Sequence, residues 1–488
     1  MQAGFLRHFL RHLPTLLAGA ALCGCAVGPN YHAPAAPQTD RYTAQPLPAD
    51  DAGNVHVVAG RDPVSDWWQG FGSDAIDSLV QQALRANPNI QAAEATLRQS
   101  LENVAAQRGY YWPTIQAQGS ATRNRDATQV LSPTLSSGAS TYSLYTPQLT
   151  VGFVPDVFGG NRRQVESLQA QADANRYQYD ATYLTLIANV VSTAIQQAGL
   201  RAQIDATQQV ISLERESLDV MHAQLDLGAI AEADVLAQQA ALAQIEATLP
   251  PLRKALDQQH DALAALTGRL PGDAADIPLE LDQLKMPTEI PVGIPSQLVE
   301  RRPDVRAAGA QLHAATASVG VAIANMLPQI TITGQLGNVA TEGSQVFAGM
   351  NEFWTIGASL SQTLFAGGML YHKERAARAG VDIAGAQYRQ AVLTAFQNVA
   401  DALRALAADA DAVALQERAY QASSASLGIT RQQYGLGAVS YLALVSAQQA
   451  FQQAVIGRAQ ALMNRYADTA ALYQALGGSA PEPSQKSR

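Results

Sequence analysis

The sequence is poor in aromatic residues and in cysteine, and it contains no long apolar run. Aromatic side chains make up 6% of the 488 residues, although 47% of the residues are hydrophobic. The hydrophobic share comes mainly from Ala, Leu and Val, with many Gln between them. This composition favours long helices packed through small side chains over a bulky globular core. The length allows two or three ordinary domains or one large elongated domain.

Positive charge is also scarce, since the formal net charge is −9. A nucleic-acid partner is therefore not expected, because binding to phosphates needs a basic surface. No stretch of 18 or more apolar residues occurs, so the sequence predicts no membrane-spanning helix. A chain of this kind can cross a bilayer only as a closed β-barrel, in which every backbone polar group finds a partner.

Motifs of catalysis and metal binding are missing as well. The sequence has no HExxH, no pair of CxxC motifs and no glycine loop of the kind that holds phosphates. The eight histidines are scattered along the chain, as surface and packing histidines usually are. We therefore expect no enzymatic activity, no catalytic residue, no metal site and no cofactor.

The first 24 residues have the pattern of a targeting segment. Arg7 and Arg11 form a basic start, and an apolar run from Leu13 to Leu22 is too short to span a membrane. The following Cys23-Gly24-Cys25 step resembles a bacterial lipoprotein signal, which is cleaved before the lipidated cysteine. We expect lipidation at Cys25, and an ordinary secretory signal with an incidental cysteine is the alternative.

Cleavage at this position has two consequences for the mature chain. Cys23 leaves with the signal and the sulfur of Cys25 carries lipid, so no free thiol and no intrachain disulfide remain. Ala26 rather than Asp follows the lipidated cysteine, which in lipoproteins generally permits sorting to the outer membrane. Two or more acyl chains then give stable anchoring.

The body of the chain repeats itself once. Matches at an offset of 215 residues pair Pro88, Leu97, Val104, Pro113 and Ile115 with Pro303, Leu312, Val319, Pro328 and Ile330. Matches at an offset of 209 residues pair Asn189–Val190, Leu227–Ala229 and Gly268 with Asn398–Val399, Leu436–Ala438 and Gly477. The sequence thus predicts a tandem duplication of a unit of roughly 210 residues.

Each repeat is expected to hold a helix, two strands, a very long helix and a shorter returning helix. No proline interrupts the 65 residues from Asn161 to Leu225, which as one helix would measure roughly 98 Å. The two shorter helices, Pro88–Gly109 and Glu232–Thr267, together approach this length. We expect them to stack end to end beside the long helix, and Pro250–Pro251 to bend the returning one.

The second repeat follows the same plan. Its long helix is expected at Met369–Tyr434, with shorter helices at Pro303–Met326 and Tyr441–Ala475. Helices this long must lie along similar helices, as in a coiled coil or bundle.

Four segments alternate between apolar and polar residues with Gly and Thr prominent. They lie at about 112–124, 140–157, 328–340 and 352–365. Such alternation is the weak signature of a membrane barrel strand, and a half-buried soluble sheet gives the same pattern. Four strands per chain cannot close a barrel, since the smallest bacterial barrels have about eight. Because an open sheet edge is forbidden in lipid, we expect several chains to share one barrel, and a cyclic trimer would give twelve strands.

Five motifs in order resemble the outer-membrane efflux factor family, the TolC-like channels, and within it the lipidated branch that serves resistance-nodulation-division pumps. The motifs are CAVGPNY at 25–31 with Pro34, DVFG at 156–159 followed by Arg162–Arg163, RRPDV at 301–305, LF at 364–365 with Gly367–Gly368, and YGLG at 434–437 with Ser440–Leu442. The resemblance covers nearly the whole mature chain.

The resemblance implies an α+β membrane protein. A trimeric 12-stranded outer-membrane β-barrel, with four strands per chain, would continue into a long periplasmic α-helical barrel built from two tandem repeats per chain. The expected organisation is a signal peptide at 1–24, an extended lipid-anchored tether at 25–66, the first repeat at 67–270, a linker in an equatorial belt at 271–295, the second repeat at 296–477 and a C-terminal tail at 478–488.

The two helical turns are expected to lie at the periplasmic tip. Gly228 and Gly437 suit helix ends that need a left-handed residue. The resemblance implies that their neighbours contact an adaptor, so the expected adaptor contacts are Leu227, Gly228, Ala229, Leu436, Gly437 and Ala438. A purely structural role as helix caps is the plain alternative.

The gate is expected among acidic residues near these turns. Family members place Asp on the second tip helix, where this chain has Ala443 and Ser446. The candidate gate residues are therefore Asp226, Glu232, Asp234 and Tyr434. Charged rings at a constriction set ion preference, whereas a solvated helix end carries the same charges without a function.

The expected function is passive export through the outer channel of a tripartite efflux pump, from the periplasm or an inner-membrane pump to the exterior. The expected partners are two further copies of the chain, a periplasmic adaptor, a resistance-nodulation-division pump and outer-membrane lipid. An exit duct for protein secretion shares this fold, and a non-porous envelope lipoprotein would leave the strands without a role. The sequence does not identify the exported compounds, the particular pump or the resting aperture.

Overall fold

The computed structural model describes residues 26–37, 39, 41–43, 56–60, 65–125, 141–273, 278–287, 289–293 and 295–477. The expected signal peptide, Cys25 and the C-terminal tail lie outside the described residues. Contacts divide the chain into two units. The first comprises Met1–Ala33, Leu97–Ala174 and Ala308–Gln387, and the second Pro34–Thr96, Asn175–Ala307 and Tyr388–Arg488.

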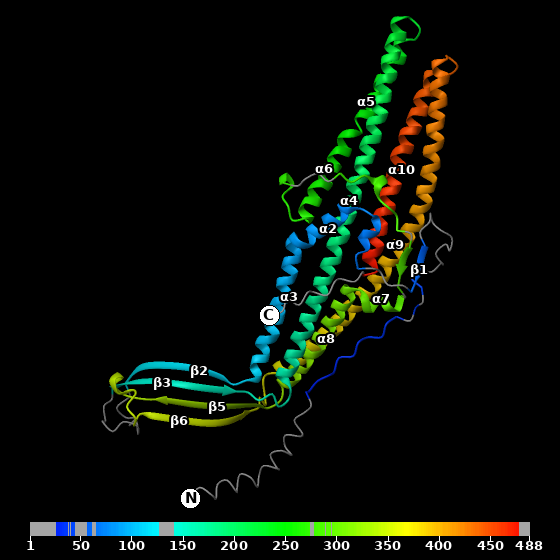
Figure 1. The fold of residues 1–488 in the computed structure, drawn as a ribbon. Helices are drawn as coiled ribbons and strands as arrows, with labels where there is room; N and C mark the ends of the chain where they lie inside the picture. Colours follow the sequence, from blue (N-terminus) through cyan, green and yellow to red (C-terminus); the bar gives the residue numbers. More distant parts are fainter. Residues whose placement is uncertain are drawn as a thin grey trace. The chain divides into compact units, whose positions relative to one another are not determined.

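The first unit contains a four-stranded antiparallel sheet in the order β2-β3-β5-β6 (Figure 1). The strands are β2 (Thr114–Arg125), β3 (Thr141–Phe153), β5 (Gln329–Asn338) and β6 (Glu352–Ser361). Each overlaps one of the four alternating segments of the sequence. The hairpins β2-β3 and β5-β6, which come from the two halves of the sequence, join through six residue pairs of β3 and β5.

Four helices contribute to the first unit. They are α3 (Pro88–Arg108), α4 (Gly160–Asp226), α8 (Pro303–Ala324) and α9 (Met369–Gly435), and each also has residues in the second unit. Among the described residues, α8 alone is long and apolar enough to cross a membrane by length and composition, with a mean hydropathy of 1.2. It packs on α4 instead, where the Ser167 hydroxyl donates to the Ala314 carbonyl at 3.0 Å.

The second unit contains the remaining helices, α2 (Asp74–Ala86), α5 (Glu232–Glu246), α6 (Leu249–Leu266), α7 (Pro295–Arg301) and α10 (Tyr441–Ala475). The expectation of one returning helix over Glu232–Thr267 is wrong, because the helix is interrupted at Ala247–Thr248. Pro250 and Pro251 stand in the first turn of α6, where the missing amide donors cost nothing. Ala247 and Thr248 keep right-handed helical φ and ψ angles, so the helix is interrupted next to the prolines, at the position expected for a bend.

Helices meet end to end at two equivalent junctions in the second unit. The Asn87 amide, just before α3, donates to the carbonyl of Leu266 at the end of α6, at 2.8 Å. In the same way Arg302, just before α8, donates to the carbonyl of Ala475 at the end of α10, at 2.8 Å. A side chain at the start of one helix thus satisfies a terminal carbonyl of the other. The expected stacking of the shorter helices is present at both junctions.

An aromatic cluster and a small sheet surround these junctions. Strand β1 (His56–Ala59) pairs in parallel with β4 (Glu289–Val292). Trp67, Trp68 and Phe71 are buried, and the ring of Trp67 stacks on that of Tyr473 at 5.1 Å between centroids. The sequence analysis expected an extended segment without a core before residue 67, and it did not foresee that β1 pairs with the linker.

The carboxyl groups of Asp409 on α9 and Asp468 on α10 face each other. Burial, followed by the neighbouring Asp468 carboxyl, raises the pKa of Asp409 to about 7, while Arg465 acts in the opposite direction. Because the folded state holds this proton more tightly than the unfolded chain, its stabilising effect is complete below the ordinary pKa of 3.8. The effect is lost as the pH rises through about 7.

Replacing Asp409 by Asn should remove this pH dependence. We expect the thermal unfolding midpoint of the wild-type protein in detergent to fall between about pH 5 and about pH 8, and that of Asp409→Asn to fall less. Circular dichroism at both pH values measures the difference. Asp411→Asn, an exposed carboxyl on the same helix, is the matched control. If the unfolding midpoints of Asp409→Asn and wild type depended equally on pH, the raised pKa of Asp409 would be contradicted.

Candidate functional site

The four-stranded sheet has one apolar and one polar face. The register of the strands places on one face Ile115, Ala117, Leu149, Val151, Ile332, Leu336, Trp354, Ile356 and Leu360. The other face carries Thr, Gln and Ser side chains such as Gln116, Gln148, Thr333 and Ser359. Ile356 is 76% exposed and Trp354 is 70% exposed, so the described residues do not cover this apolar face.

The length of the apolar face along the strands matches the apolar band of an outer-membrane barrel. On β3 it runs without charge from Tyr145 to Phe153, a distance of about 26 Å at roughly 3.3 Å per residue. The apolar band of outer-membrane barrels is about 25 Å tall. Arg125, which pairs with Thr141, lies beyond one end, and the exposed Trp112 lies beyond the other. Exposed aromatic residues at such an end are typical of a membrane interface.

Both edges of the sheet lack a partner among the described residues. Strand β2 pairs only with β3, and β6 pairs only with β5. Alternate residues of β2, which has twelve residues, and of β6, which has ten, therefore present backbone donors and acceptors to the outside. Such long, flat edges invite pairing with another strand.

The two helical hairpins of the second unit end in matching turns. After α4, the Ala229 amide donates to the Gln224 carbonyl and the Gly228 amide to the Leu225 carbonyl, both at 2.8 Å. After α9, Ala438 and Gly437 repeat this pattern at 2.8 and 2.9 Å. The φ angles of Gly228 and Gly437 are +70° and +72°, as the predicted left-handed caps require.

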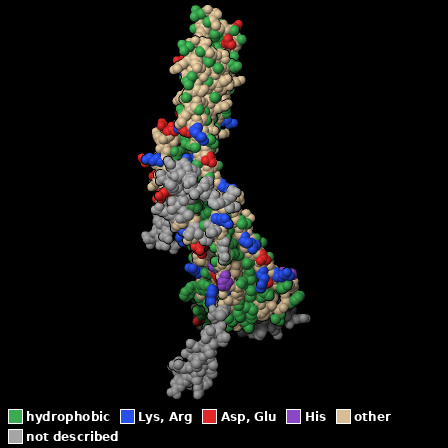
Figure 2. Space-filling model, turned by 90° about the vertical axis from the view of Figure 1, so that its right-hand side faces the viewer, with side chains coloured by type: hydrophobic (Ala, Val, Ile, Leu, Met, Phe, Trp, Pro, Cys, Tyr) green, Lys and Arg blue, Asp and Glu red, His purple; other side chains and the backbone are tan. Residues whose placement is uncertain are grey.

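The side chains around both turns are exposed and mostly uncharged. Leu227 and Leu436 are each 84% exposed, and the neighbouring Ala229 and Ala438 are exposed as well. Figure 2 shows this end of the hairpins at its upper edge, with hydrophobic side chains among uncharged groups and few charges. The two equivalent turns thus expose apolar side chains to solvent.

The candidate gate residues have different surroundings. Asp226 and Glu232 are exposed at the ends of α4 and α5. Asp234 is half-buried and accepts a hydrogen bond from the Ala231 amide at 3.3 Å, which caps α5. Tyr434 on α9 donates to the Gln224 side chain on α4 at 3.4 Å. The structure therefore brings Tyr434 to the first hairpin and gives Asp234 a structural role at its helix start.

A buried polar network, which the sequence analysis missed, links the two hairpins next to these residues. Glu214 on α4 is 2% exposed and accepts a hydrogen bond from the Gln238 amide of α5 at 2.6 Å. The Tyr441 hydroxyl of α10 donates to the Gln238 oxygen. Burial raises the pKa of Glu214, although Gln238 and Arg431 act in the opposite direction. A polar residue within the apolar stripe Val210, Ile211, Leu218 and Met221 was the available signal.

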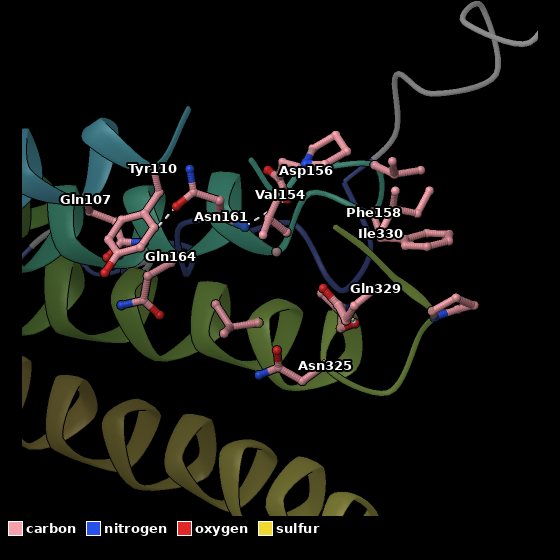
Figure 3. A pocket seen from close by; sticks show the side chains of 16 residues that line it. Gln107, Tyr110, Val154, Asp156, Phe158, Asn161, Gln164, Asn325, Gln329 and Ile330 are labelled. Atoms are coloured by element: carbon pink, nitrogen blue, oxygen red, sulfur yellow. Dashed lines mark hydrogen bonds between the residues drawn. The ribbon is translucent and has the colours of Figure 1, made fainter. Parts of the chain in front are cut away.

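A cavity of about 270 Å³ with a mixed polar and apolar lining lies in the first unit, beside the start of α4 (Figure 3). Asp156 caps α4 by accepting from the amides of Asn161 and Arg162 at 2.9 and 2.7 Å. The Asn161 side chain accepts from Gln107 at 2.7 Å. The other polar side chains that line it are the amides of Gln164, Asn325 and Gln329 and the hydroxyl of Tyr110. Neutral amides and one phenol around a carboxylate that caps a helix do not form a nucleophile paired with a general base.

The model of a protein family described as "Outer membrane efflux protein" matches residues 79–269 and 294–478. These two stretches comprise most of the chain. It belongs to the outer membrane efflux protein family. The family resemblance inferred from the five motifs is confirmed, and the family is one of channels rather than of enzymes.

Relatives of this outer membrane efflux protein match over nearly their whole length. The antibiotic efflux pump outer membrane protein ArpC of Pseudomonas putida is 27% identical over 464 residues, which cover 94% of this chain and 93% of ArpC. The solved structure of the outer-membrane channel OprN is 30% identical, with a TM-score of 0.83, and covers 93% of this chain and 99% of OprN. The Campylobacter jejuni CmeC channel, at 21% identity and a TM-score of 0.84, shares the fold over 93% of this chain and 95% of CmeC.

A charge on the apolar face of the sheet should disrupt this efflux protein, whereas a charge on the polar face should not. Arg at the membrane midplane of a barrel's lipid face costs about 2–4 kcal/mol. We therefore expect Ile356→Arg to lower the thermal unfolding midpoint and the amount of protein in the outer-membrane fraction. Thr355→Arg, on the adjacent residue and the opposite face, is the matched control. Equal effects of both changes would mean that the apolar face does not meet lipid.

Proposed function

We propose that the chain is the outer-membrane exit duct of a tripartite efflux pump and exports drugs or other small toxic compounds passively. The sheet carries this proposal, because its apolar face and both its edges have no partner among the described residues of one chain. Three chains that pair β2 of one with β6 of the next would close a 12-stranded barrel with the polar face lining water. The names of the relatives, which include antibiotic efflux and channel proteins, support the same function.

The two halves of the chain would then form a nearly six-fold ring of helices, continuing the barrel into the periplasm. The paired hairpins, the matching turns and the two equivalent helix junctions support the tandem duplication that we propose for residues 67–270 and 296–477. The proposed belt contains the linker at 271–295, and the proposed lipoprotein signal places an acyl anchor at Cys25.

We propose that the exposed turns contact a periplasmic adaptor, which connects the duct to a resistance-nodulation-division pump. Leu227 and Leu436 are large apolar side chains that the described chain leaves exposed on two equivalent caps. Neighbouring exposed apolar side chains of this kind suit packing against helices of a partner. Opening would follow from a shift of the hairpins, which the Glu214-Gln238-Tyr441 network opposes within one chain.

The acidic residues at the tip give the duct an expected ion preference. Replacing both Asp226 and Asp234 by Asn removes two charges per chain, and an Asn side chain still caps a helix. We expect planar-bilayer recordings of the double variant to show a lower cation preference than those of the wild type. Glu280→Gln, an exposed acid in the belt, is the control and should leave the preference unchanged.

Two outcomes would count against these assignments. An unchanged ion preference in the double variant would remove Asp226 and Asp234 from the gate while leaving the duct intact. Because a closed gate is also silent, the recordings include Gln238→Ala, in which the buried network is broken. Silence in that variant as well would contradict the exit duct and favour the non-porous envelope lipoprotein.

A further inference from the structure

The first residues of the described chain occupy a site in the first unit. We propose that the hexapeptide Ala26–Tyr31 is bound as a ligand by a site centred on Arg163, here called the clasp, which holds Ala26 against the Phe158–Gly159 turn. The clasp consists of Phe158–Gly159, Arg163, Glu166, His313 and Gly320. The sequence analysis had assigned this hexapeptide to a tether.

Arg163 provides the polar recognition. Its side chain is 5% exposed, and its donors are directed at the peptide and at one carboxylate. Nε donates to the Val27 carbonyl at 3.0 Å, and Nη2 donates to the Gly28 carbonyl at 3.3 Å and to Asn30 Oδ1 at 2.8 Å. Nη1 donates to Glu166 Oε2 at 2.7 Å. A lysine cannot reproduce this planar fork of donors.

The aromatic end of the peptide is held through His313. The rings of Tyr31 and His313 stack, with centroids 4.5 Å apart and an interplanar angle of 12°. His313 Nε2 lies 2.9 Å from Glu166 Oε1, so this carboxylate contacts both Arg163 and His313. Burial acts to raise the pKa of Glu166, but its hydrogen bonds to His313 and Arg163 hold that pKa below the ordinary value.

The backbone of the peptide fits against three glycines. Gly28 has a φ angle of +94°, and a Cβ at this position would lie 2.5 Å from the Cα of Gly320. A Cβ on Gly320 would meet Arg163 Cγ at 2.7 Å, and one on Gly159 would meet Ala26 at 2.7 Å. The Val27 amide donates to the Phe158 carbonyl at 3.2 Å. The peptide is thus packed too closely for a side chain at any of these three points.

The clasp binds the chain directly next to the proposed lipidation site. Residue 25 follows Ala26 by one peptide unit, about 3.8 Å between Cα atoms, and Ala26 packs on the turn between β3 and α4. If the peptide left, the buried guanidinium of Arg163 would lose three acceptors, which is costly for a buried charge. If Cys25 is lipidated as proposed, the acyl chains would therefore enter the membrane directly beside the base of the sheet and not at the end of a flexible linker.

Hydrogen exchange tests the clasp in the full-length, detergent-extracted protein. We expect the amides of fragment 26–31, above all that of Val27, to exchange at least about tenfold more slowly than in the isolated peptide of the same sequence. In Gly28→Ala the protection should be lost, because the added Cβ meets Gly320. Gly60→Ala is the matched control, since Gly60 has a similar φ of +82° with nothing within 4 Å of an added Cβ. Wild-type exchange at the rate of the isolated peptide would overturn the proposal.

Two further variants test whether the guanidinium of Arg163, rather than its charge or the lipid, holds the peptide. Arg163→Lys keeps the charge beside Glu166, and we expect it to lose most of the protection while the thermal unfolding midpoint changes little. Full protection in Arg163→Lys would contradict the role of the guanidinium. Cys25→Ser removes the acyl acceptor and should leave the protection intact, whereas its loss would show that lipid, not the clasp, holds the peptide. Failure to incorporate labelled palmitate into the wild type would refute the lipid anchor and leave the clasp standing.

Discussion

The structure depends on a backbone constraint at the two open edges of one sheet. In a hydrocarbon environment every amide and carbonyl must find a partner, and the described residues of one chain supply only four strands to this sheet. The apolar face makes the same demand, because its largest side chains are exposed in the single chain. The proposed barrel, shared between chains, would satisfy both demands at once. The long helices would then continue the proposed ring, since a helix of 67 residues needs parallel neighbours along its length.

The hairpin ends show how the same fold can hold a movable element. Their outer surface is apolar and exposed, while the interior contains Glu214, Gln238 and Tyr441 in one hydrogen-bonded group. A buried carboxylate without partners is expensive, so the network favours a single arrangement of the two hairpins. A partner that packs on the exposed leucines could supply the free energy needed to change that arrangement.

Much of this architecture was predictable from the sequence, because it rests on long periodic patterns. The limits of α10 and the left-handed glycines at 228 and 437 are those expected, and both long helices are within two residues of their expected ends. The two-residue break before Pro250 was harder to place, since a proline is tolerated in the first turn of a helix as well as at a bend. The pairing of β1 with β4 joins segments more than 200 residues apart, and four residues carry too little pattern to reveal it.

The site was predictable only in part, for a related reason. Turn residues such as Gly228 are set by local geometry, whereas the roles of Glu214 and Arg163 depend on side chains distant in sequence. Arg163 lay within a motif that the sequence singled out, yet its acceptors in Val27 and Asn30 appear only once the chain is folded. Asp234, chosen as a gate residue for its charge, also caps a helix, and a short-range motif could have shown this.

The mass of the particle extracted from the outer membrane tests the shared barrel most directly. Native mass spectrometry in a mild detergent should give three copies of the chain, and a change that breaks the edge of β2 or β6 should give single chains without a folded sheet. A particle of one chain that still conducts ions in a bilayer would contradict the account, because four strands cannot enclose a pore.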